Sequence, residues 1–193
     1  MRTFIAIELP QKIIGTLSAL QNQLKNTQAD VKWVAPENIH LTLKFLGEVD
    51  EKKIEKIIQA LEETAKDNQP FSIRLCALGA FPKINFPRVI WVGIDAGDEE
   101  TKNIAFVLEE KLQKLGIPKE KRPFSSHITI GRVRSGLNRE KLVKELNILA
   151  GQSANYCADL EFLTTKITLF KSTLTPKGPI YEILKEASFQ IKS

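Results

Sequence analysis

The two histidines of this 193-residue chain begin the same four-residue pattern. His40 begins "HLTL" and His127 begins "HITI", so each imidazole precedes an aliphatic residue, a threonine and a second aliphatic residue. Side chains two positions apart in a β-strand point to the same side. We therefore expect His40 and Thr42 to share one strand face and His127 and Thr129 to share another, with the aliphatic residues turned toward the core.

Two imidazoles and two hydroxyls suit phosphoryl transfer without a metal. A histidine titrates near neutral pH, with an ordinary pKa of about 6.5. One neutral imidazole can take a proton while a protonated one gives a proton on the other side of the reacting centre. The threonine hydroxyls can donate hydrogen bonds to the two non-bridging oxygens of a phosphodiester.

Other chemistries leave part of the pattern unused. A zinc site needs three or four His, Cys or carboxylate ligands, and threonine is a poor one. A Ser–His–Asp triad would employ only one of the two motifs, and the chain has neither GxxxxGK[ST] nor GxGxxG. Read singly, each motif fits an ordinary strand histidine beside a threonine chosen for strand propensity; the matched pair argues against that interpretation.

Periodicity and turn residues predict the elements that carry these motifs. Strands are expected at 2–9, 31–34, 39–45, 71–79, 88–94, 127–133, 155–163, 166–172 and 179–189, and helices at 10–27, 51–67, 98–115 and 137–150. Each histidine opens the series strand, helix, strand, strand, which indicates an internal repeat. Two similar units packed about a pseudo-two-fold axis would bring the histidine strands face to face. No low-complexity linker divides the chain, so we expect residues 1–193 to form a single domain of two interleaved lobes.

Composition bounds the partners and the compartment. The net charge of +5 and the sequence pI of about 9.1 are compatible with a phosphate-bearing partner. The apolar run at the N-terminus is too short for a signal peptide, and no apolar stretch approaches the roughly 18 residues of a membrane span. We expect a cytoplasmic monomer without membrane contact.

Two segments resemble the motif blocks of a known family. "HLTLKFLGEV" (40–49) and "RPFSSHITIGRV" (122–133) are similar to those of the 2H phosphoesterases, in the branch of RNA 2′,3′-cyclic phosphodiesterases, also called 2′-5′ RNA ligases. "RTFIAIELP" (2–10) and "GPIYEIL" (178–184) extend the resemblance over nearly the whole chain. It implies a bilobal α+β fold in which two pseudo-two-fold-related antiparallel sheets line a central cleft, with helices outside.

The resemblance also implies an activity and the roles of the motif residues. The reaction is hydrolysis of RNA 2′,3′-cyclic phosphate to a 2′-phosphate end without metal or cofactor, together with reversible ligation through 2′-5′ linkages. The partner is RNA with such an end or linkage, with tRNA fragments among the candidates. His40 takes the role of proton donor and His127 that of proton acceptor, while Thr42 and Thr129 bind the phosphate. The motifs are nearly symmetric, so this order of donor and acceptor rests on the resemblance.

Further substrate contacts are expected from Arg132, Arg122, Phe124 and Tyr181. Arg132 lies an odd number of positions from His127, which would aim it at the opposite face unless a bulge or the strand end intervenes. The same parity argument places Phe45 in the core. Lys119, Lys121, Arg134 and Arg139 are basic neighbours that could receive an RNA backbone.

Two alternative functions stay open. The same fold could act on a small cyclic nucleotide or on an ADP-ribose cyclic phosphate. The chain could also be a non-catalytic module that binds RNA ends, although a mere binder could use Lys or Arg in place of two intact His and Thr pairs.

Overall fold

The computed structural model describes residues 1–153, 157 and 159–191, which form two antiparallel sheets and flanking helices. The strands are β1 (Arg2–Glu8), β2 (Val31–Trp33), β3 (His40–Glu48), β4 (Phe71–Lys83), β5 (Phe86–Ile94), β6 (His127–Val133), β7 (Glu161–Thr164), β8 (Lys166–Thr175) and β9 (Gly178–Ser188). The helices are α1 (Gln11–Lys25), α2 (Ile54–Lys66), α3 (Asp98–Gln113) and α4 (Arg139–Gly151), with short 3-10 turns at Pro36–Asn38 and Glu51–Lys53.

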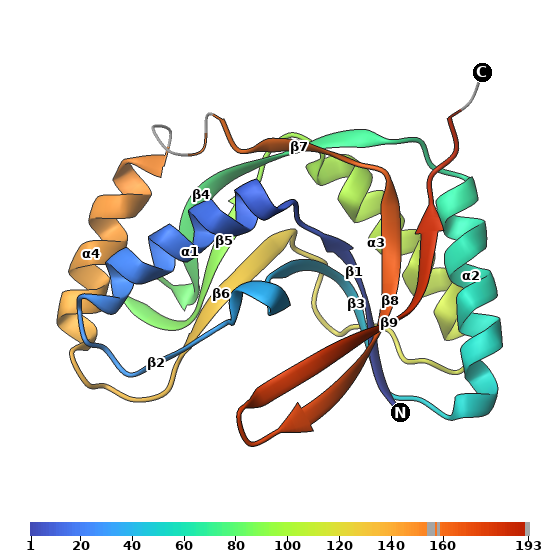
Figure 1. Cartoon of the computed structure of the whole chain (residues 1–193), viewed down its shortest axis with the longest axis horizontal. Helices are drawn as coiled ribbons and strands as arrows, with labels where there is room; N and C mark the ends of the chain where they lie inside the picture. Colours follow the sequence, from blue (N-terminus) through green and yellow to red (C-terminus); the bar gives the residue numbers. More distant parts are fainter. Residues whose placement is uncertain (154–156, 158, 192–193) are drawn as a thin grey trace.

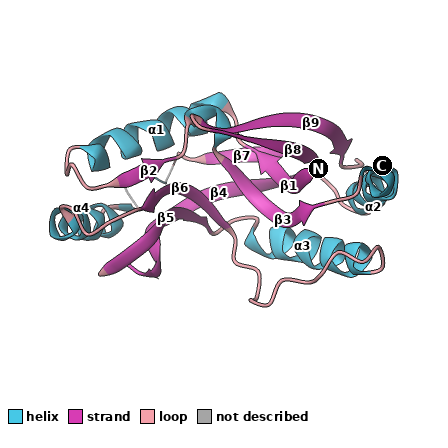
Figure 2. Ribbon diagram, turned by 90° about the horizontal axis from the view of Figure 1, so that it is seen from below, coloured by secondary structure: helices cyan, strands magenta, loops and turns pink. Residues whose placement is uncertain are grey.

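Each sheet carries one of the two histidine strands. The smaller sheet has the order β3-β1-β8-β9 and the larger sheet the order β2-β6-β5-β4-β7. Helices α2 and α3 pack against the smaller sheet, and α1 and α4 pack against the larger one (Figure 1). The smaller sheet joins strands from both ends of the chain, since β1 pairs with β8. This arrangement confirms the expected α+β fold with antiparallel sheets and outer helices (Figure 2).

The core forms on the sheet faces that the helices cover. Helix α1 turns an apolar stripe inward, and Ile13, Leu17 and Leu24 are buried at the helical spacing expected from the sequence. Leu41 of β3 and Ile128 of β6 are fully buried in the same cluster. These aliphatic residues hold the back of each histidine strand, so the His and Thr side chains lie on the opposite face.

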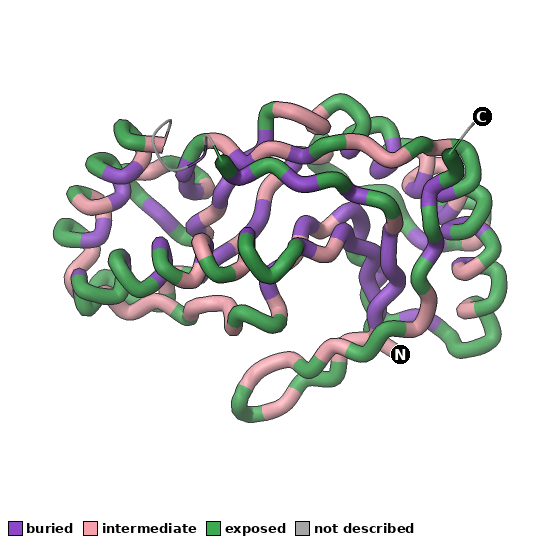
Figure 3. The backbone as a smooth tube through the Cα atoms, turned by 45° about the horizontal axis from the view of Figure 1, so that its top comes forward, coloured by how far each residue is buried: buried purple, intermediate pink, exposed green. Residues whose placement is uncertain are grey.

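The β8–β9 hairpin extends beyond the body of the molecule (Figure 1). Residues 171–186 are all exposed or half-buried (Figure 3). The amide Nδ2 of Asn38 donates a hydrogen bond of 2.9 Å to the carbonyl of Pro179. The start of β9, beside the hairpin turn, is therefore tied to the turn that precedes His40.

The expected elements differ from the structure mainly at their ends. Strands β4 and β5 continue through the segment around Pro82 and Pro87 that we expected to be a loop. The expected strand 155–163 is wrong in its first part: Cys157 is helical, and a strand begins only at Glu161. Cys157 and Leu160 are both buried and joined by a backbone hydrogen bond of 3.0 Å, which is the spacing of a turn. Residues 155, 156 and 158 of that prediction lie outside the described residues.

Within the part of the chain that the structure describes, no helix has the length and apolar character needed to cross a bilayer.

Candidate active site

A β-bulge in β3 sets which side chains accompany His40. Ala6 of β1 pairs with Thr42, but the next residue, Ile5, pairs with Lys44, so Leu43 is an extra residue in β3. Leu43 and Lys44 are both buried, and the alternation of the strand is reversed beyond them. Phe45 therefore lies on the face of His40 and Thr42 and is 53% exposed. Its predicted place in the core is wrong because the parity argument assumed an unbroken strand.

The same bulge occurs at the equivalent place in β6. Trp91 of β5 pairs with Thr129, whereas Ile90 pairs with Gly131, so Ile130 is the extra residue. Ile130 and Gly131 are both buried, and Arg132 is exposed beyond them. The bulge brings Arg132 onto the face of His127 and Thr129, where unbroken alternation would have excluded it.

Buried contacts hold the bulge of β6 in place. The side-chain amide of Gln21 donates hydrogen bonds of 2.8 Å to the carbonyls of Val34 and Ile130. A side chain at Gly131 would place its Cβ 2.9 Å from the Trp33 ring, so the indole occupies the space that glycine leaves. Gln21 is 2% exposed. The buried amide therefore binds the carbonyl of the extra residue directly.

A buried lysine connects β3 with the segment that leads to β6. Lys44 follows the extra residue of β3 and is 2% exposed. Its Nζ lies 2.6 Å from Oε1 of Glu109 on α3 and donates a hydrogen bond of 2.9 Å to the carbonyl of Pro118. Because a buried charge is costly unless it is paired and hydrogen-bonded, this cluster fixes the loop before His127 against the strand of His40.

Both imidazoles are oriented by the same local hydrogen bond. Nδ1 of His40 lies 2.7 Å from the carbonyl of Asn38, and Nδ1 of His127 lies 2.7 Å from the carbonyl of Ser125. A carbonyl only accepts, so Nδ1 carries the hydrogen in each ring. Among the described residues no hydrogen bond occupies Nε2 of either ring. Each Nε2 is therefore available to take a proton when the ring is neutral or to give one when it is charged.

Burial lowers the pKa of both imidazoles. Burial lowers the pKa of His40, and the hydrogen bond to Asn38 offsets part of this effect. Burial also lowers the pKa of His127, the hydrogen bond to Ser125 opposes it, and the positive charge of Arg132 lowers the pKa further. Both rings thus titrate below their ordinary value, which is about 6.5.

Aromatic rings surround His40. Phe4 of β1 stacks on the imidazole with ring centroids 4.8 Å apart, and Tyr181 of β9 meets the imidazole edge-on at 5.6 Å. Phe4 also stacks on Phe170 at 5.1 Å and lies 6.1 Å from Phe45. We call His40, Thr42, Phe4, Phe45 and Tyr181 the His40 half-site. Its surface is apolar apart from the histidine, the threonine and the phenol.

The surroundings of His127 combine aromatic rings with a positive charge. Phe81 meets the imidazole edge-on at 5.1 Å and lies 5.2 Å from Trp91. We call His127, Thr129, Phe81, Trp91 and Arg132 the His127 half-site. Trp91 lies over Gly79, where an added Cβ would be 2.4 Å from the indole. Phe4 and Phe81 do not stand out in the sequence, because only the strand pairing places them beside the histidines.

The two half-sites lie close together. Strands β3 and β6 are in contact. Burial raises the pKa of Tyr181 in the His40 half-site, and the charges of Arg2 and Arg132 oppose that rise. Arg132 therefore acts electrostatically on both half-sites. Among the described residues no hydrogen bond engages the hydroxyl of Thr42 or Thr129, so each can donate to a ligand.

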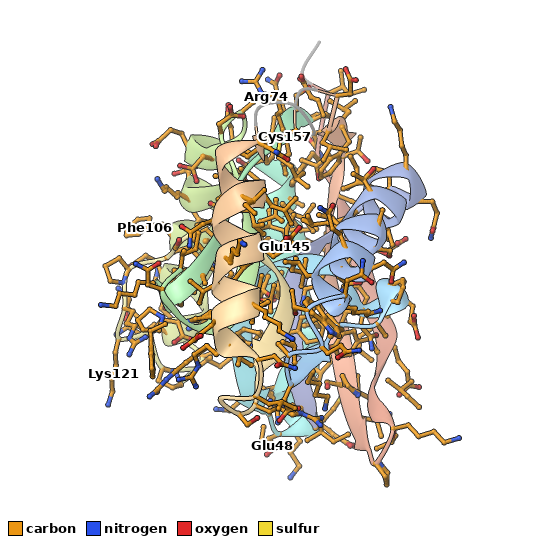
Figure 4. The ribbon with its side chains drawn as sticks, turned by 90° about the vertical axis from the view of Figure 1, so that its left-hand side faces the viewer. Glu48, Arg74, Phe106, Lys121, Glu145 and Cys157 are labelled. Atoms are coloured by element: carbon orange, nitrogen blue, oxygen red, sulfur yellow. The ribbon has the colours of Figure 1, made fainter. Side chains whose placement is uncertain are left out.

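The remaining predicted contacts lie farther out. Arg122 is exposed, and Phe124 is half-buried and packs against the main core. Lys121 points away from the body of the molecule (Figure 4). A hollow of about 380 Å³ between the N-terminus and residues 171–174 of β8 includes Arg2 and Lys171 in its lining but neither histidine. Among residues 1–153, 157 and 159–191, no three His, Cys, Asp or Glu side chains gather as a metal site would require.

A family model and curated relatives match nearly the whole chain. The model described as LigT like phosphoesterase matches twice, at residues 7–91 and 92–181. His40 lies in the first match and His127 in the second, which supports the internal repeat. A protein of Methanocaldococcus jannaschii named RNA 2′,3′-cyclic phosphodiesterase is 41% identical over 186 residues, which are 96% of this chain and 99% of that protein. A protein of the same name from Archaeoglobus fulgidus is 37% identical over 96% of this chain and 98% of its own length.

A solved structure shows the same fold. A protein of Thermus thermophilus superposes with a TM-score of 0.79 at 28% sequence identity, and the match covers 98% of both chains. The arrangement of sheets and helices is thus shared over nearly the whole of both chains.

Proposed function

The chain belongs to the LigT-like phosphoesterase family, and on that premise we propose that it hydrolyses RNA 2′,3′-cyclic phosphate ends to 2′-phosphomonoester ends. One observation carries the proposal: each motif holds its imidazole by the same 2.7 Å hydrogen bond from Nδ1, with Nε2 unoccupied and a threonine hydroxyl beside it. The curated relatives carry the name of this activity.

The reaction needs one proton taken and one proton given. We assign the first step to Nε2 of His127, which takes a proton from water as the water oxygen attacks phosphorus. The bond between phosphorus and the 3′ oxygen breaks, and Nε2–H of protonated His40 gives that oxygen its proton. The phosphate stays on the 2′ oxygen. Thr42 and Thr129 donate to the two non-bridging oxygens, whose charge increases in the transition state.

The same groups support ligation. If a 5′ hydroxyl replaces water as the attacking group, His127 takes its proton and a 2′-5′ phosphodiester forms. The positive charge of Arg132 favours the phosphate, and the rings of Tyr181 and Phe45 can stack on a base. No step in this scheme needs a metal or a cofactor.

We further propose that residues 1–193 act as one domain and as a monomer, in the cytoplasm. Strands from both halves build the smaller sheet, and a single chain supplies both histidines. The two half-sites stay together only if the N-terminal and C-terminal halves of the chain fold as one unit.

The test is the product formed from an RNA oligonucleotide that ends in a 2′,3′-cyclic phosphate, in buffer with EDTA. We expect turnover to a 2′-phosphate end, distinguished from a 3′-phosphate by ³¹P NMR. The variant with both His40→Ala and His127→Ala is the control for contaminating nucleases and should be inactive. No turnover, a 3′-phosphate product, turnover that requires an added divalent cation, or equal turnover by the double variant would each contradict the proposal.

A further inference from the structure

Two cations stand directly opposite each other at the edge of the larger sheet. Lys32 of β2 pairs in register with Arg132 of β6, and both side chains are exposed. Neither forms an ion pair or a side-chain hydrogen bond with another described residue. Like charges directly opposite each other in an antiparallel pair destabilise the sheet. The pair therefore costs stability unless an anion binds between the two side chains.

The pair lies on the same face as the candidate active site. Val31 and Trp33, on either side of Lys32, turn to the other face and pack over Gly131. Lys32 is thus left on the face of Arg132, and the bulge of β6 makes this the face of His127. The charge of Arg132 lowers the pKa of His127, although less than burial does, so Arg132 and the imidazole are electrostatic neighbours.

Across the sheet, the residues in register with Lys32 and Arg132 are uncharged, so the basic side chains lie only at the β2 edge. Arg132 also pairs with Val89 of β5, and Val89 pairs with Phe81 of β4. The two cations thus lie on the side of the His127 half-site that is next to the edge strand β2. On this face of β6, Arg132 is the next side chain after Thr129 and the second after His127. One such step is roughly 7 Å along the strand, so Arg132 lies about that far from Thr129.

We propose that Lys32 and Arg132 form a second anion subsite, which binds the phosphodiester immediately upstream of the cyclic phosphate. This inference rests on the proposed function and names its substrate class: the end of an RNA strand in preference to a mononucleoside cyclic phosphate. The strand leaves the site over β2, with its last internal phosphate between the two cations.

The test compares two substrates that differ by one phosphodiester. A dinucleotide with a terminal 2′,3′-cyclic phosphate has an internal phosphate, and a nucleoside 2′,3′-cyclic phosphate has none. We expect the wild type to prefer the dinucleotide, and Lys32→Gln to lower the ratio of the two kcat/KM values by about tenfold, mainly through KM. For the dinucleotide, the slope of log(kcat/KM) against log salt is negative in the wild type, and in Lys32→Gln it should be less negative by about one.

Lys144→Gln is the matched control. It removes the same charge from an exposed position on α4, which packs against β4 and α1 rather than against the histidine strands. It should keep the wild-type ratio. A dinucleotide whose internal linkage is a neutral methylphosphonate should lose the preference in the wild type, and Lys32→Gln should change its kcat/KM little further.

The outcomes separate the two proposals. If the wild type turns over neither substrate, the proposed function fails. If it turns over both, and Lys32→Gln leaves the ratio as it is or lowers it no more than Lys144→Gln does, the second subsite is wrong and the hydrolase assignment stands.

Discussion

Strands β3 and β6 have the same bulge at the second aliphatic residue of the motif, but they present different side chains beyond it. Five positions after the histidine, β3 carries Phe45 and β6 carries Arg132. The neighbouring strands follow the same division, with Phe4 beside Phe45 and Lys32 beside Arg132. The backbone of the site and its His and Thr pairs are thus repeated, while the side chains beyond the bulge are not.

This difference gives the site a direction. Proton transfer needs two imidazoles with Nε2 available, and the repeat supplies them with the same hydrogen bond at Nδ1. A nucleotide end is asymmetric, because a base lies on one side of the cyclic phosphate and the charged strand on the other. An aromatic His40 half-site suits the base, and a basic His127 half-site suits the strand. The divergence of the two half-sites therefore selects the orientation in which the RNA end binds.

The largest expected effect comes from the residues that the half-sites share. His40→Ala and His127→Ala should each lower kcat by about a hundredfold to ten-thousandfold, because each removes one proton transfer. The double variant should be little worse than either single variant, since the two groups act in one step. Steady-state kinetics with circular dichroism as a check on folding would measure this. Multiplicative losses would indicate independent roles and contradict the pairing.

A smaller effect is expected at the position where the half-sites differ. Arg132→Gln should lower kcat/KM by about tenfold or more, since hydrogen bonds to a charged group are the stronger ones. Removing the positive charge should also raise the pKa of His127, as followed by NMR titration. Phe45→Leu should raise KM by about fivefold through weaker stacking and leave both pKa values near those of the wild type. Equal effects of the two substitutions on the pKa of His127 would remove the proposed division.

The smallest effect is the pH dependence that both half-sites share. Burial lowers the pKa of both imidazoles. The bell-shaped profile of kcat/KM, which reports the free enzyme, should therefore have its maximum below pH of about 6.5. At pH values between the folded pKa values and about 6.5, the unfolded chain binds more protons than the folded chain does. The free energy of unfolding that the two histidines contribute is therefore fully present above about pH 6.5 and falls as the pH drops through this range. Urea unfolding at pH 5 and pH 7.5 measures the second effect. A maximum above pH 7 would contradict the direction of the shifts.

The sequence predicted the motif pairs and nearly all the elements, because strict alternation and helical spacing reflect burial directly. It failed at Phe45 and was ambiguous at Arg132 for one reason: a bulge is a property of strand pairing, and neither Leu43 nor Ile130 differs in type from an ordinary strand residue. The contacts that hold the bulge of β6, such as that from Gln21, join segments more than 100 positions apart in the chain. The contribution of Phe4 and Lys32 was unpredictable for the same reason, since each depends on which strand lies beside the motif.

In the proposed mechanism both imidazoles act on one phosphate, and a crystal structure with a nucleoside 2′-phosphate bound would show whether they do. We expect Nε2 of His40 and Nε2 of His127 each to lie within about 3.2 Å of an oxygen of the same phosphate. A phosphate that contacts only one imidazole, with the other too far away to transfer a proton to it, would rule out the two-histidine mechanism.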